Sequence, residues 1–455
     1  MPAHPPDATP TLTPTIGSFA LAMISFTLSA ALSLLDRGYH VTLIEKRPFF
    51  GGRAFSFRDG DTGVEVDNGQ HVFLGCCTYY TEYLKSIGSY DGTYLQNGLR
   101  IEVVSEGESG VLLSTPALGR FHLLPSFIKY PHLSIRGKIL AAYGLLRAHF
   151  INRSRDSRLD DESAYAWLKR HGQTEHVIDN LWNLIILPAL NDDVRNVSAD
   201  MALMVIQEGI LNGPGASSVG YSKVGLTTLN GDPAQQFIEG RGGDVLLGLG
   251  VKELVMDGGI VGSVKLTDGN SINADAYVSA LPNRVLHDLI DSKPNLGEFV
   301  SSVDVLEEAP IVGIHFWYDR HVMDGDFVAF LNSPVQFVFN KSHIQGRAEE
   351  TGQYLCVSLS GAWDYIDMPK SELVDMFTCE MARLFHRASD AAVTRVLVVK
   401  ERNATFRCIP GNAKRRPGQV TVIPNLFLAG DWTDTGWPAT MEAAFQPPFW
   451  QNGSL

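Results

Sequence analysis

The chain has 455 residues, of which 45% are hydrophobic and 19% charged, proportions that belong to a folded protein and exclude wholesale disorder. At this length it can form roughly two or three domains around a large buried core. The net charge of -13 argues against a nucleic-acid-binding protein, because such proteins present a basic surface. The 5 cysteines form neither a C-x-x-C pair nor a metal-ligand spacing, so we expect free thiols and no metal site.

The first 35 residues divide into a polar tail and an apolar segment. Residues 1–15 are rich in proline and threonine, and we expect a disordered tail. Residues 16–35 are almost wholly apolar and about as long as a membrane-crossing helix, yet the start MPAHPPDATP lacks the basic region of a signal peptide. Three interpretations of this segment stay open: a membrane anchor, a buried helix of a cofactor-binding domain, and an altered end of the chain.

A nucleotide-binding β-α-β pattern overlaps the apolar segment. A helix ends at LLDRGY, the strand HVTLIEKR contains Glu45, and a turn follows with Gly51, Gly52 and Arg53. A carboxylate at this strand end can accept the hydroxyl hydrogens of an adenosine ribose. Glycines let the backbone approach a pyrophosphate, whose oxygens match a guanidinium group. The pattern therefore predicts a dinucleotide site.

The pieces of this pattern are scattered along the chain. Apolar helical segments dominate from about 90 to 230, and strand-like runs return at 242–282, where a buried strand ends at Ala280. A last buried strand, NLFLAGDW, lies near the C-terminus. This order predicts an α/β (α+β) fold in which a Rossmann-like domain is interrupted by a partly helical one. We assign the cofactor domain to 16–90, 232–295 and 400–455, and the substrate domain to 91–231 and 296–399.

Three motifs carry a resemblance to a known superfamily. They are E-K-R-P-x-x-G-G-R-A from Glu45, D-N-G-Q-H-V-F-L-G from Asp67, and N-L-F-L-A-G-D-W-T-D-T-G-W-P-A-T-M-E from Asn425. They resemble the flavin-containing amine oxidases and phytoene desaturases. Together with LWNLIILPALNDDVRNVSADMALMVIQEG, they are most similar to the squalene-associated FAD-dependent desaturases, the hydroxysqualene dehydroxylases of bacterial hopanoid synthesis.

The resemblance implies a domain of the glutathione-reductase and amine-oxidase type that holds FAD. Glu45 is expected to hold the adenosine ribose, Val251 the adenine through its backbone, and Asp431 a ribityl or phosphate group. Residues 440–442 are expected to open a helix whose amide groups face the flavin and stabilise negative charge on it. The expected FAD contacts are Glu45, Gly51, Gly52, Arg53, Gly69, Gln70, Val251, Ala280, Gly430, Asp431, Thr440, Met441 and Glu442.

The resemblance also implies the reaction: reduced flavin gives a hydride to an allylic carbon of hydroxysqualene as the hydroxyl leaves, forming squalene. This reaction needs an external reductant such as NAD(P)H and a proton donor, for which the candidates are Asp67, His71 and Asp192. Since Asp192 and Asp193 end an apolar helix, they are alternatively two solvated helix-terminal acids. Desaturation of a carotenoid precursor and oxidation of a small amine are the alternative reactions, and the apolar content of 121–150 argues against the amine.

Basic and apolar residues recur together from Arg120 to Arg158, with a single acid. Such a stretch either packs as ordinary amphipathic helices or lies on an anionic membrane from which an isoprenoid can enter. The second interpretation places the protein in the cytoplasm, peripheral on the inner face of the bacterial membrane.

Both ends of the chain depart from the family's pattern. The glycine positions of G-x-G-x-x-G hold Ala22, Ile24 and Thr27, and the last two side chains would obstruct the approach of the backbone to phosphate. After MEAA, the ending FQPPFWQNGSL places two prolines where the relatives continue a helix. These departures support a further hypothesis, a non-catalytic relative that binds FAD poorly.

Overall fold

The computed structural model describes residues 17–22, 28–290, 299–300, 303, 306–347 and 351–446. The predicted tail at 1–15, Ile24 and Thr27 of the altered glycine turn, and the two prolines at 447–448 lie outside the described residues.

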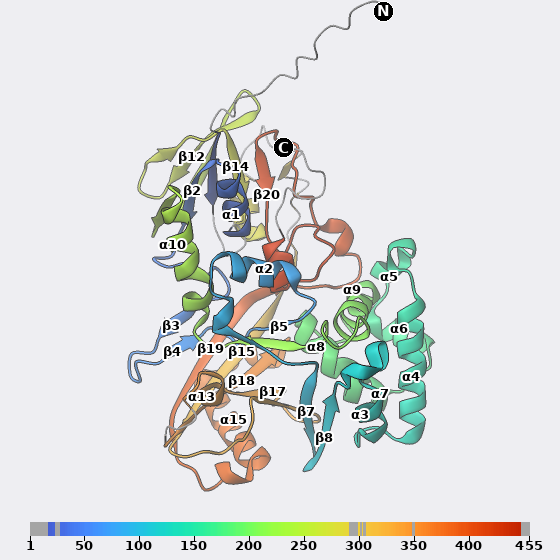
Figure 1. The fold of residues 1–455 in the computed structure, drawn as a ribbon. Helices are drawn as coiled ribbons and strands as arrows, with labels where there is room; N and C mark the ends of the chain where they lie inside the picture. Colours follow the sequence, from blue (N-terminus) through green and yellow to red (C-terminus); the bar gives the residue numbers. More distant parts are fainter. Residues whose placement is uncertain are drawn as a thin grey trace, which may run out of the picture.

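A parallel sheet of five strands forms the upper part of the molecule in Figure 1. Every neighbouring pair of strands in it is parallel. On one side of β1 the next strands in the sheet are β2 and β10, and on the other side they are β14 and β20. The strand order therefore reverses between β1 and β14. Ligands of such sheets bind at this point, beyond the carboxyl ends of the strands. The order is β10 (Asp244–Leu247), β2 (His40–Glu45), β1 (Ser18–Ala22), β14 (Ala276–Ser279) and β20 (Leu426–Leu428).

The apolar segment 16–35 contributes the central strand β1 and the buried helix α1 (Leu28–Asp36). Strands of a parallel sheet are covered on both faces, which explains why this segment carries no charged residue. No helix among the described residues has both the length and the apolar composition needed to cross a membrane. The segment belongs to the parallel sheet and to a helix that covers it, and its first half is a strand where we expect a helix.

Two layers cover the parallel sheet. On one face, Val278 packs in a cluster with Leu32 of α1 and Ala234 of α10 (Asp232–Gly240). On the other face, Tyr277 packs with Leu254 and other residues of an antiparallel sheet. The strands of this sheet are β11 (Val251–Asp257), β12 (Ile260–Leu266) and β13 (Ser271–Ile272). Successive side chains of β14 thus pack into two different hydrophobic cores, one on each face of the sheet. The predicted α/β fold is confirmed.

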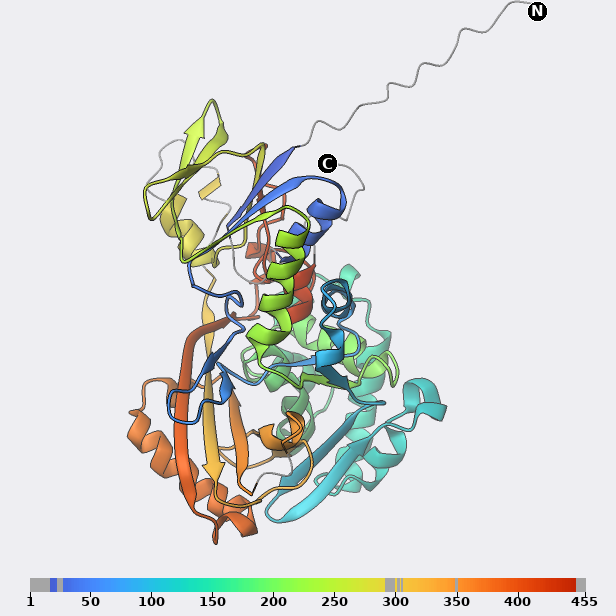
Figure 2. The ribbon, with the colours of Figure 1, turned by 60° about the vertical axis from the view of Figure 1, so that its left-hand side comes forward.

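A seven-stranded sheet lies below the parallel sheet in both views (Figures 1 and 2). Helix α15 (Lys370–Leu384) packs against it. The long strand β19 runs through position 400, where we had placed a domain limit, so this limit does not coincide with the end of an element. The strand order is β19 (Val393–Phe406), β15 (Glu308–Tyr318), β18 (Gln353–Ser360), β17 (Phe337–Asn340), β16 (Phe327–Phe330), β7 (Arg100–Ser105) and β8 (Glu108–Leu113).

The prediction of helices from about residue 90 is wrong for the segment 93–113, which forms β6 (Thr93–Leu95), β7 and β8. Glu106 and Gly107 both have positive φ, 49° and 84°, as in the tight two-residue turns that join antiparallel strands. In addition, β7 pairs in parallel with β16, a strand far along the chain. Such a partner leaves no local signal in the sequence.

The helical lobe follows at the right of Figure 1 and is built around α4 (Ile135–Phe150). The buried side of α4 carries Gly137, Ala141, Gly144 and Ala148, so small residues face the protein. A Cβ at Gly144 would lie 2.8 Å from the Trp182 ring, which shows how closely α4 packs. The other helices of the lobe are α3 (Leu124–Lys129), α5 (Arg158–Asp161), α6 (Ala164–Arg170), α7 (Glu175–Val177), α8 (Asn183–Leu190) and α9 (Ala199–Met204).

Short elements connect the sheets and the lobe. Two small sheets are formed by β3 (Ser56–Arg58) with β4 (Glu65–Asp67), and by β5 (Val72–Leu74), β9 (Val219–Ser222) and β6. The remaining helices are α2 (Thr78–Ser86), α11 (Asn283–Ile290), α13 (Lys341–Ile344), α14 (Trp363–Ile366) and α16 (Met441–Phe445).

Candidate cofactor and substrate site

The carboxyl edge of the parallel sheet brings together residues that the sequence scatters. Glu45 ends β2, Ala280 follows β14, and Gly430 and Asp431 follow β20. The backbone N–H of Leu249 donates to the carbonyl of Glu45 at 3.1 Å, which holds the start of β11, with Val251, beside the same edge. A nucleotide-binding crevice is expected at this place in a sheet of this order.

One oxygen of the Glu45 carboxylate is available to accept a hydrogen bond from a ligand. It is 4% exposed, and its Oε1 accepts from the Arg47 backbone N–H at 2.8 Å. Its Oε2 is buried and has no hydrogen-bond partner among the described residues. Burial raises the pKa of Glu45, while the bonds from Arg47 oppose the shift. A buried acceptor without a donor is costly, and a ribose hydroxyl is a donor that would satisfy it.

Two serine hydroxyls at the same edge have the same character. Ser29 lies in the first turn of α1, and Ser279 ends β14. Both Oγ atoms are buried without a hydrogen-bond partner in the part of the chain that the structure describes. Together with Glu45 Oε2 they form a set of unsatisfied polar atoms around the crevice. The residues present therefore fit a polar cofactor such as a dinucleotide.

The glycine turn positions Arg53. Gly51 and Gly52 have φ of 141° and 53°, and a Cβ at Gly51 would lie 2.8 Å from the Ala54 carbonyl oxygen. Only glycine fits this turn without strain. The Arg53 guanidinium forms an ion pair with Asp431, and its Nη1 also donates to the Ala404 carbonyl at 3.3 Å. The turn after β2 and the loop after β20 thus meet through two predicted FAD contacts.

A buried arginine that the sequence analysis missed holds the loop after β20. Arg416 is 6% exposed, and its Nη2 donates to the carbonyls of Asp431 (2.9 Å) and Thr433 and to the Thr435 hydroxyl (3.1 Å). Arg416 stands in the basic run KRRPG, which carries no local signal that separates a buried arginine from an exposed one.

Helix α16 begins at the predicted position. Thr440 precedes it, and its Oγ1 accepts from the Ala443 backbone N–H at 3.3 Å. The carboxylate of Glu442 does not point to the crevice, because it accepts from the backbone N–H groups of Tyr79 and Tyr80, each at 3.1 Å, at the start of α2. Its side chain therefore caps α2, and a contact of Glu442 with FAD stays a prediction for its backbone only.

A cavity of about 700 Å³ extends from this edge toward the helical lobe. Arg53, Asp431 and Met441 line its inner end. Phe121 and Phe150, which are 72% and 75% exposed, line its outer end. Apolar side chains form most of the wall between these ends, among them Leu99, Phe127, Leu145, Leu181, Ile185, Phe337 and Phe339.

Asp67 lies behind the cavity wall in a buried ion pair. Its Oδ2 accepts from Lys341 Nζ at 2.8 Å, and the two side chains are 4% and 1% exposed. Its Oδ1 accepts from the Leu226 backbone N–H at 3.0 Å. Lys341 Nζ also donates to Gln70 Oε1 at 3.2 Å, so the pair supports the turn whose residues Gly69, Gln70 and His71 line the cavity. Asp67 itself does not line it, which gives its predicted role as a proton donor no geometric support.

His71 lines the cavity, and its ring makes no hydrogen bond within the described residues. Burial lowers the pKa of His71; the charge of Asp67 opposes the shift and that of Lys341 adds to it. The imidazole is therefore neutral at neutral pH, suited to hydrogen bonding more than to donating a proton.

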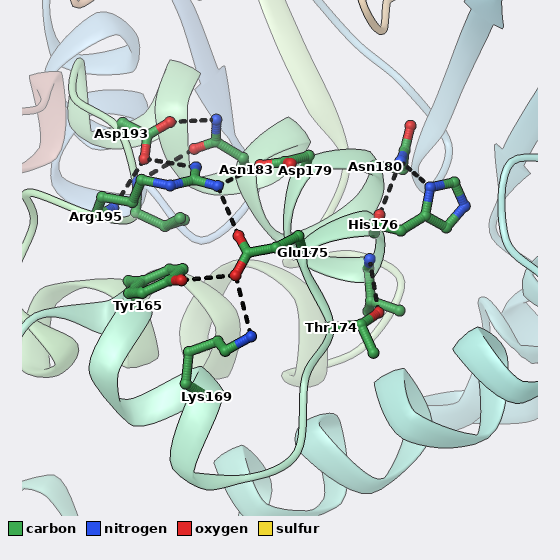
Figure 3. Close-up of polar contacts among 12 residues, drawn as sticks. Tyr165, Lys169, Thr174, Glu175, His176, Asp179, Asn180, Asn183, Asp193 and Arg195 are labelled. Atoms are coloured by element: carbon green, nitrogen blue, oxygen red, sulfur yellow. Dashed lines mark hydrogen bonds and ion pairs between the residues drawn. The ribbon is translucent and has the colours of Figure 1, made fainter.

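Asp192 and Asp193 do not line the cavity. Asp192 is 1% exposed, and its Oδ2 accepts from Arg407 Nε at 2.7 Å. Asp193 accepts from Asn183 Nδ2 at 2.8 Å and pairs with Arg195, in a polar cluster that joins α6, α7 and α8 (Figure 3). The expectation of two solvated acids is wrong for Asp192, because Arg407 accompanies its burial, and the geometry gives no support for a catalytic role.

Glu401 is a cavity carboxylate that the sequence analysis missed. It lies on β19 opposite Ile311 of β15, and both residues line the cavity. Asn68 Nδ2 donates to Glu401 Oε1 at 3.0 Å and to the Arg53 carbonyl at 2.9 Å. Glu401 stands between Lys400 and Arg402 in the sequence, and a charged run of this kind carries no local signal of a cavity residue.

Comparison with known proteins agrees with this site. The profile of the family described as flavin containing amine oxidoreductase matches residues 28–446. The chain is 28% identical to the hydroxysqualene dehydroxylase of Sinorhizobium fredii, over 92% of this chain and 93% of that protein. It is 26% identical to the 15-cis-phytoene desaturase of Synechococcus elongatus, over 92% and 91% of the two chains.

The fold is similar to that of a solved oxidoreductase from Methanosarcina mazei, with a TM-score of 0.68 at 14% identity, covering 94% of this chain and 97% of the other. Three findings lead to the same conclusion: the positions of Glu45, Arg53 and Asp431 at the sheet edge, the reversal of the strand order, and the match to the family. The chain belongs to the flavin containing amine oxidoreductase family and is an FAD-dependent oxidoreductase.

Proposed function

We propose that the enzyme reduces an allylic alcohol of a long isoprenoid, and specifically that it converts hydroxysqualene to squalene. The observation that carries the proposal is the apolar cavity that runs from Arg53 and Asp431 at the crevice to Phe121 and Phe150 at the surface. Similarity to a hydroxysqualene dehydroxylase, at 28% identity, supports the choice of substrate. When bound and reduced, FAD supplies the hydride, and an external reductant such as NAD(P)H restores it.

The cavity wall suits a long apolar chain. Its volume of about 700 Å³ lies within the range of roughly 300–1,000 Å³ that is typical of ligand sites. Burial of apolar surface contributes about 25 cal/mol per Å², so a wall of leucine, isoleucine and phenylalanine can bind an isoprenoid without directed bonds. Among the polar groups on the wall, Gln70 and His71 belong to the same turn and can orient a single hydroxyl.

The amine and desaturase alternatives differ in what they demand of this wall. A small amine is expected to need a compact polar pocket, which the apolar wall does not provide. Desaturation of a carotenoid precursor fits the same wall, and 26% identity to a phytoene desaturase keeps it as the second candidate. In that reaction oxidised flavin removes a hydride, so the products separate the two.

The outer end of the cavity is suited to an anionic membrane surface. Ile135 and Ile139, on the outward side of α4, are 80% and 66% exposed, and Phe150 ends the same helix. Arg136 and Arg147 are exposed on α4 beside them. An apolar helix face with basic residues at its border binds at the headgroup level of anionic lipids. A substrate dissolved in the bilayer would then enter between Phe121 and Phe150, with the enzyme peripheral on the cytoplasmic face.

The test is an anaerobic incubation of the purified protein with hydroxysqualene, FAD and a chemical reductant, followed by mass-spectrometric detection of squalene. Squalene is expected only in the presence of enzyme and reductant. If no squalene forms while absorbance shows bound flavin, the assignment is wrong. A parallel incubation of the oxidised protein with phytoene tests the second candidate, because a product with an added double bond identifies a desaturase.

A further inference from the structure

We infer that Glu401 gives the proton to the departing hydroxyl and that Asn68 holds it in place for this step. The inference rests on the proposed dehydroxylation and names a residue for a role that the substrate chemistry requires. Hydroxide is a poor leaving group, so a C–O bond breaks readily only when its oxygen receives a proton in the transition state.

Glu401 is fixed in relation to the cofactor crevice. Asn68, which is 2% exposed, donates through Nδ2 to Glu401 Oε1 at 3.0 Å and to the Arg53 carbonyl at 2.9 Å. Its Oδ1 accepts from the Phe55 backbone N–H at 3.2 Å, so the amide cannot rotate without losing a bond. Because Arg53 pairs with Asp431, a continuous set of contacts joins Glu401 to the loop after β20.

Glu401 also has an oxygen available to a substrate. Its Oε2 takes part in no hydrogen bond among the described residues, and the residue forms part of the cavity wall. Ile311, its register partner on β15, belongs to the same wall and is apolar. One carboxylate oxygen is thus held by Asn68, while the other has no hydrogen bond among the described residues and belongs to a residue of the cavity wall.

The other carboxylates near the site are engaged or distant. Asp67 and Asp192 are each paired with a buried or half-buried cation behind the wall. Asp431 holds Arg53. Glu208 lines the cavity on the helical side and accepts from Asn212 Nδ2 at 3.3 Å, next to the lobe and away from the crevice. His71 also lines the cavity, and burial lowers the pKa of its imidazole.

The step balances as follows. The proton on Glu401 moves to the hydroxyl oxygen, the C–O bond breaks with both electrons going to that oxygen, and water departs. Reduced FAD, when bound, would supply the hydride that the allylic carbon accepts, and would itself be oxidised. Glu401 is left as a carboxylate beside the carbon that carries positive charge during the reaction, and its charge stabilises that carbon. Glu401 regains its proton from water, and a nicotinamide-type reductant restores the flavin.

The decisive variant is Glu401→Gln, assayed on two substrates. Glutamine keeps the size of the side chain and an oxygen that can accept from Asn68, but it has no transferable proton. One substrate is hydroxysqualene, and the other is the analogue with fluorine in place of the hydroxyl, since fluoride leaves without a proton. We expect kcat on the alcohol to fall by about 10²–10⁴-fold, the range for loss of general acid catalysis, and kcat on the fluoride to change by less than about tenfold.

Two further variants sharpen the test. Glu401→Asp keeps a carboxylic acid but, because its side chain is shorter, moves the acid away from the substrate. We expect an intermediate loss of kcat on the alcohol and full activity on the fluoride. Glu372→Gln, at an exposed position in the first turn of α15, is the matched control and should leave both activities unchanged. The flavin absorbance of each oxidised variant, and its change on adding hydroxysqualene, report cofactor and substrate binding without turnover.

An equal loss on both substrates would overturn the inference, because a proton donor affects only the alcohol. Loss of bound flavin from both Glu401 variants would also overturn it and assign Glu401 a structural role. If the wild-type enzyme reduces neither compound while it binds flavin, the proposed function itself fails, and the inference fails with it.

Discussion

Breaking the buried ion pair behind the Gly69–His71 turn should strongly destabilise the protein, and replacing its cation tests this. In Lys341→Met, the carboxylate of Asp67 keeps the backbone N–H of Leu226 at 3.0 Å but loses the ammonium at 2.8 Å. Both side chains are at most 4% exposed, so water cannot replace the lost partner. Breaking a buried pair by removing one member costs about 3–5 kcal/mol, because the remaining charge stays buried.

The assay is urea unfolding of the flavin-bound protein, followed by tryptophan fluorescence. We expect the free energy of unfolding to fall by about 3–5 kcal/mol in Lys341→Met, and by less in the double variant Asp67→Asn/Lys341→Met, which leaves no buried charge. Lys252→Met, at an exposed position on β11, is the control and should stay within about 0.5 kcal/mol of the wild type. If Lys341→Met behaves like this control, or if the double variant is no more stable than Lys341→Met, the reasoning is refuted.

Four more predictions concern the cofactor, pH and the membrane. Glu45→Ala should weaken FAD binding by roughly ten- to a hundredfold, because a bond to a charged acceptor contributes about 1.5–3 kcal/mol; an unchanged Kd in a flavin-fluorescence titration would contradict this. If the altered glycine turn limits binding, changing Ala22, Ile24 and Thr27 to glycine should raise flavin retention, whereas stoichiometric flavin in the dialysed wild-type protein would refute the hypothesis of a flavin-defective relative. Burial lowers the pKa of His315 to about 4, so the unfolded chain binds a proton that the native protein does not between pH 6.5 and 4. Stability should therefore fall as pH falls through this window, by about 3 kcal/mol more in the wild type than in His315→Gln; equal slopes would exclude this residue. Finally, the protein should sediment with anionic vesicles at low salt and less at high salt, and Arg136→Gln/Arg147→Gln should weaken sedimentation; equal binding to neutral and anionic vesicles would remove the electrostatic part of the proposal.

The sequence predicts those parts of the site that have a local cause. Glu45 was identified because a strand of alternating residues ends there, and Gly51 and Gly52 because a turn with positive φ needs glycine. The resemblance to the family implied the helix after Thr440, and the structure has this helix at the expected position, capped by the Thr440 side chain.

What the sequence could not predict depends on partners far along the chain. Asp192 was interpreted as a proton donor or as a solvated acid, because no residue near it in the sequence indicates its ion pair with Arg407. Lys341 and Glu401 carry no local signal of a buried or cavity position, and only the pairing of distant strands and turns places them beside Asp67 and Asn68. Glu442 was expected to contact the flavin through its backbone amide, and nothing in its sequence neighbourhood indicated that its carboxylate caps α2, a helix at the other end of the sequence. The strands at 93–113 were missed for the same reason, because β7 is completed by β16.

A single-turnover experiment tests the central claim of isoprenoid reduction most directly. The flavin-bound protein is reduced anaerobically, freed of excess reductant and mixed with hydroxysqualene, while flavin absorbance and squalene are followed together. The account predicts that flavin is reoxidised at the rate at which squalene appears, with one squalene formed per flavin. Flavin that stays reduced while hydroxysqualene is bound in the cavity would contradict it.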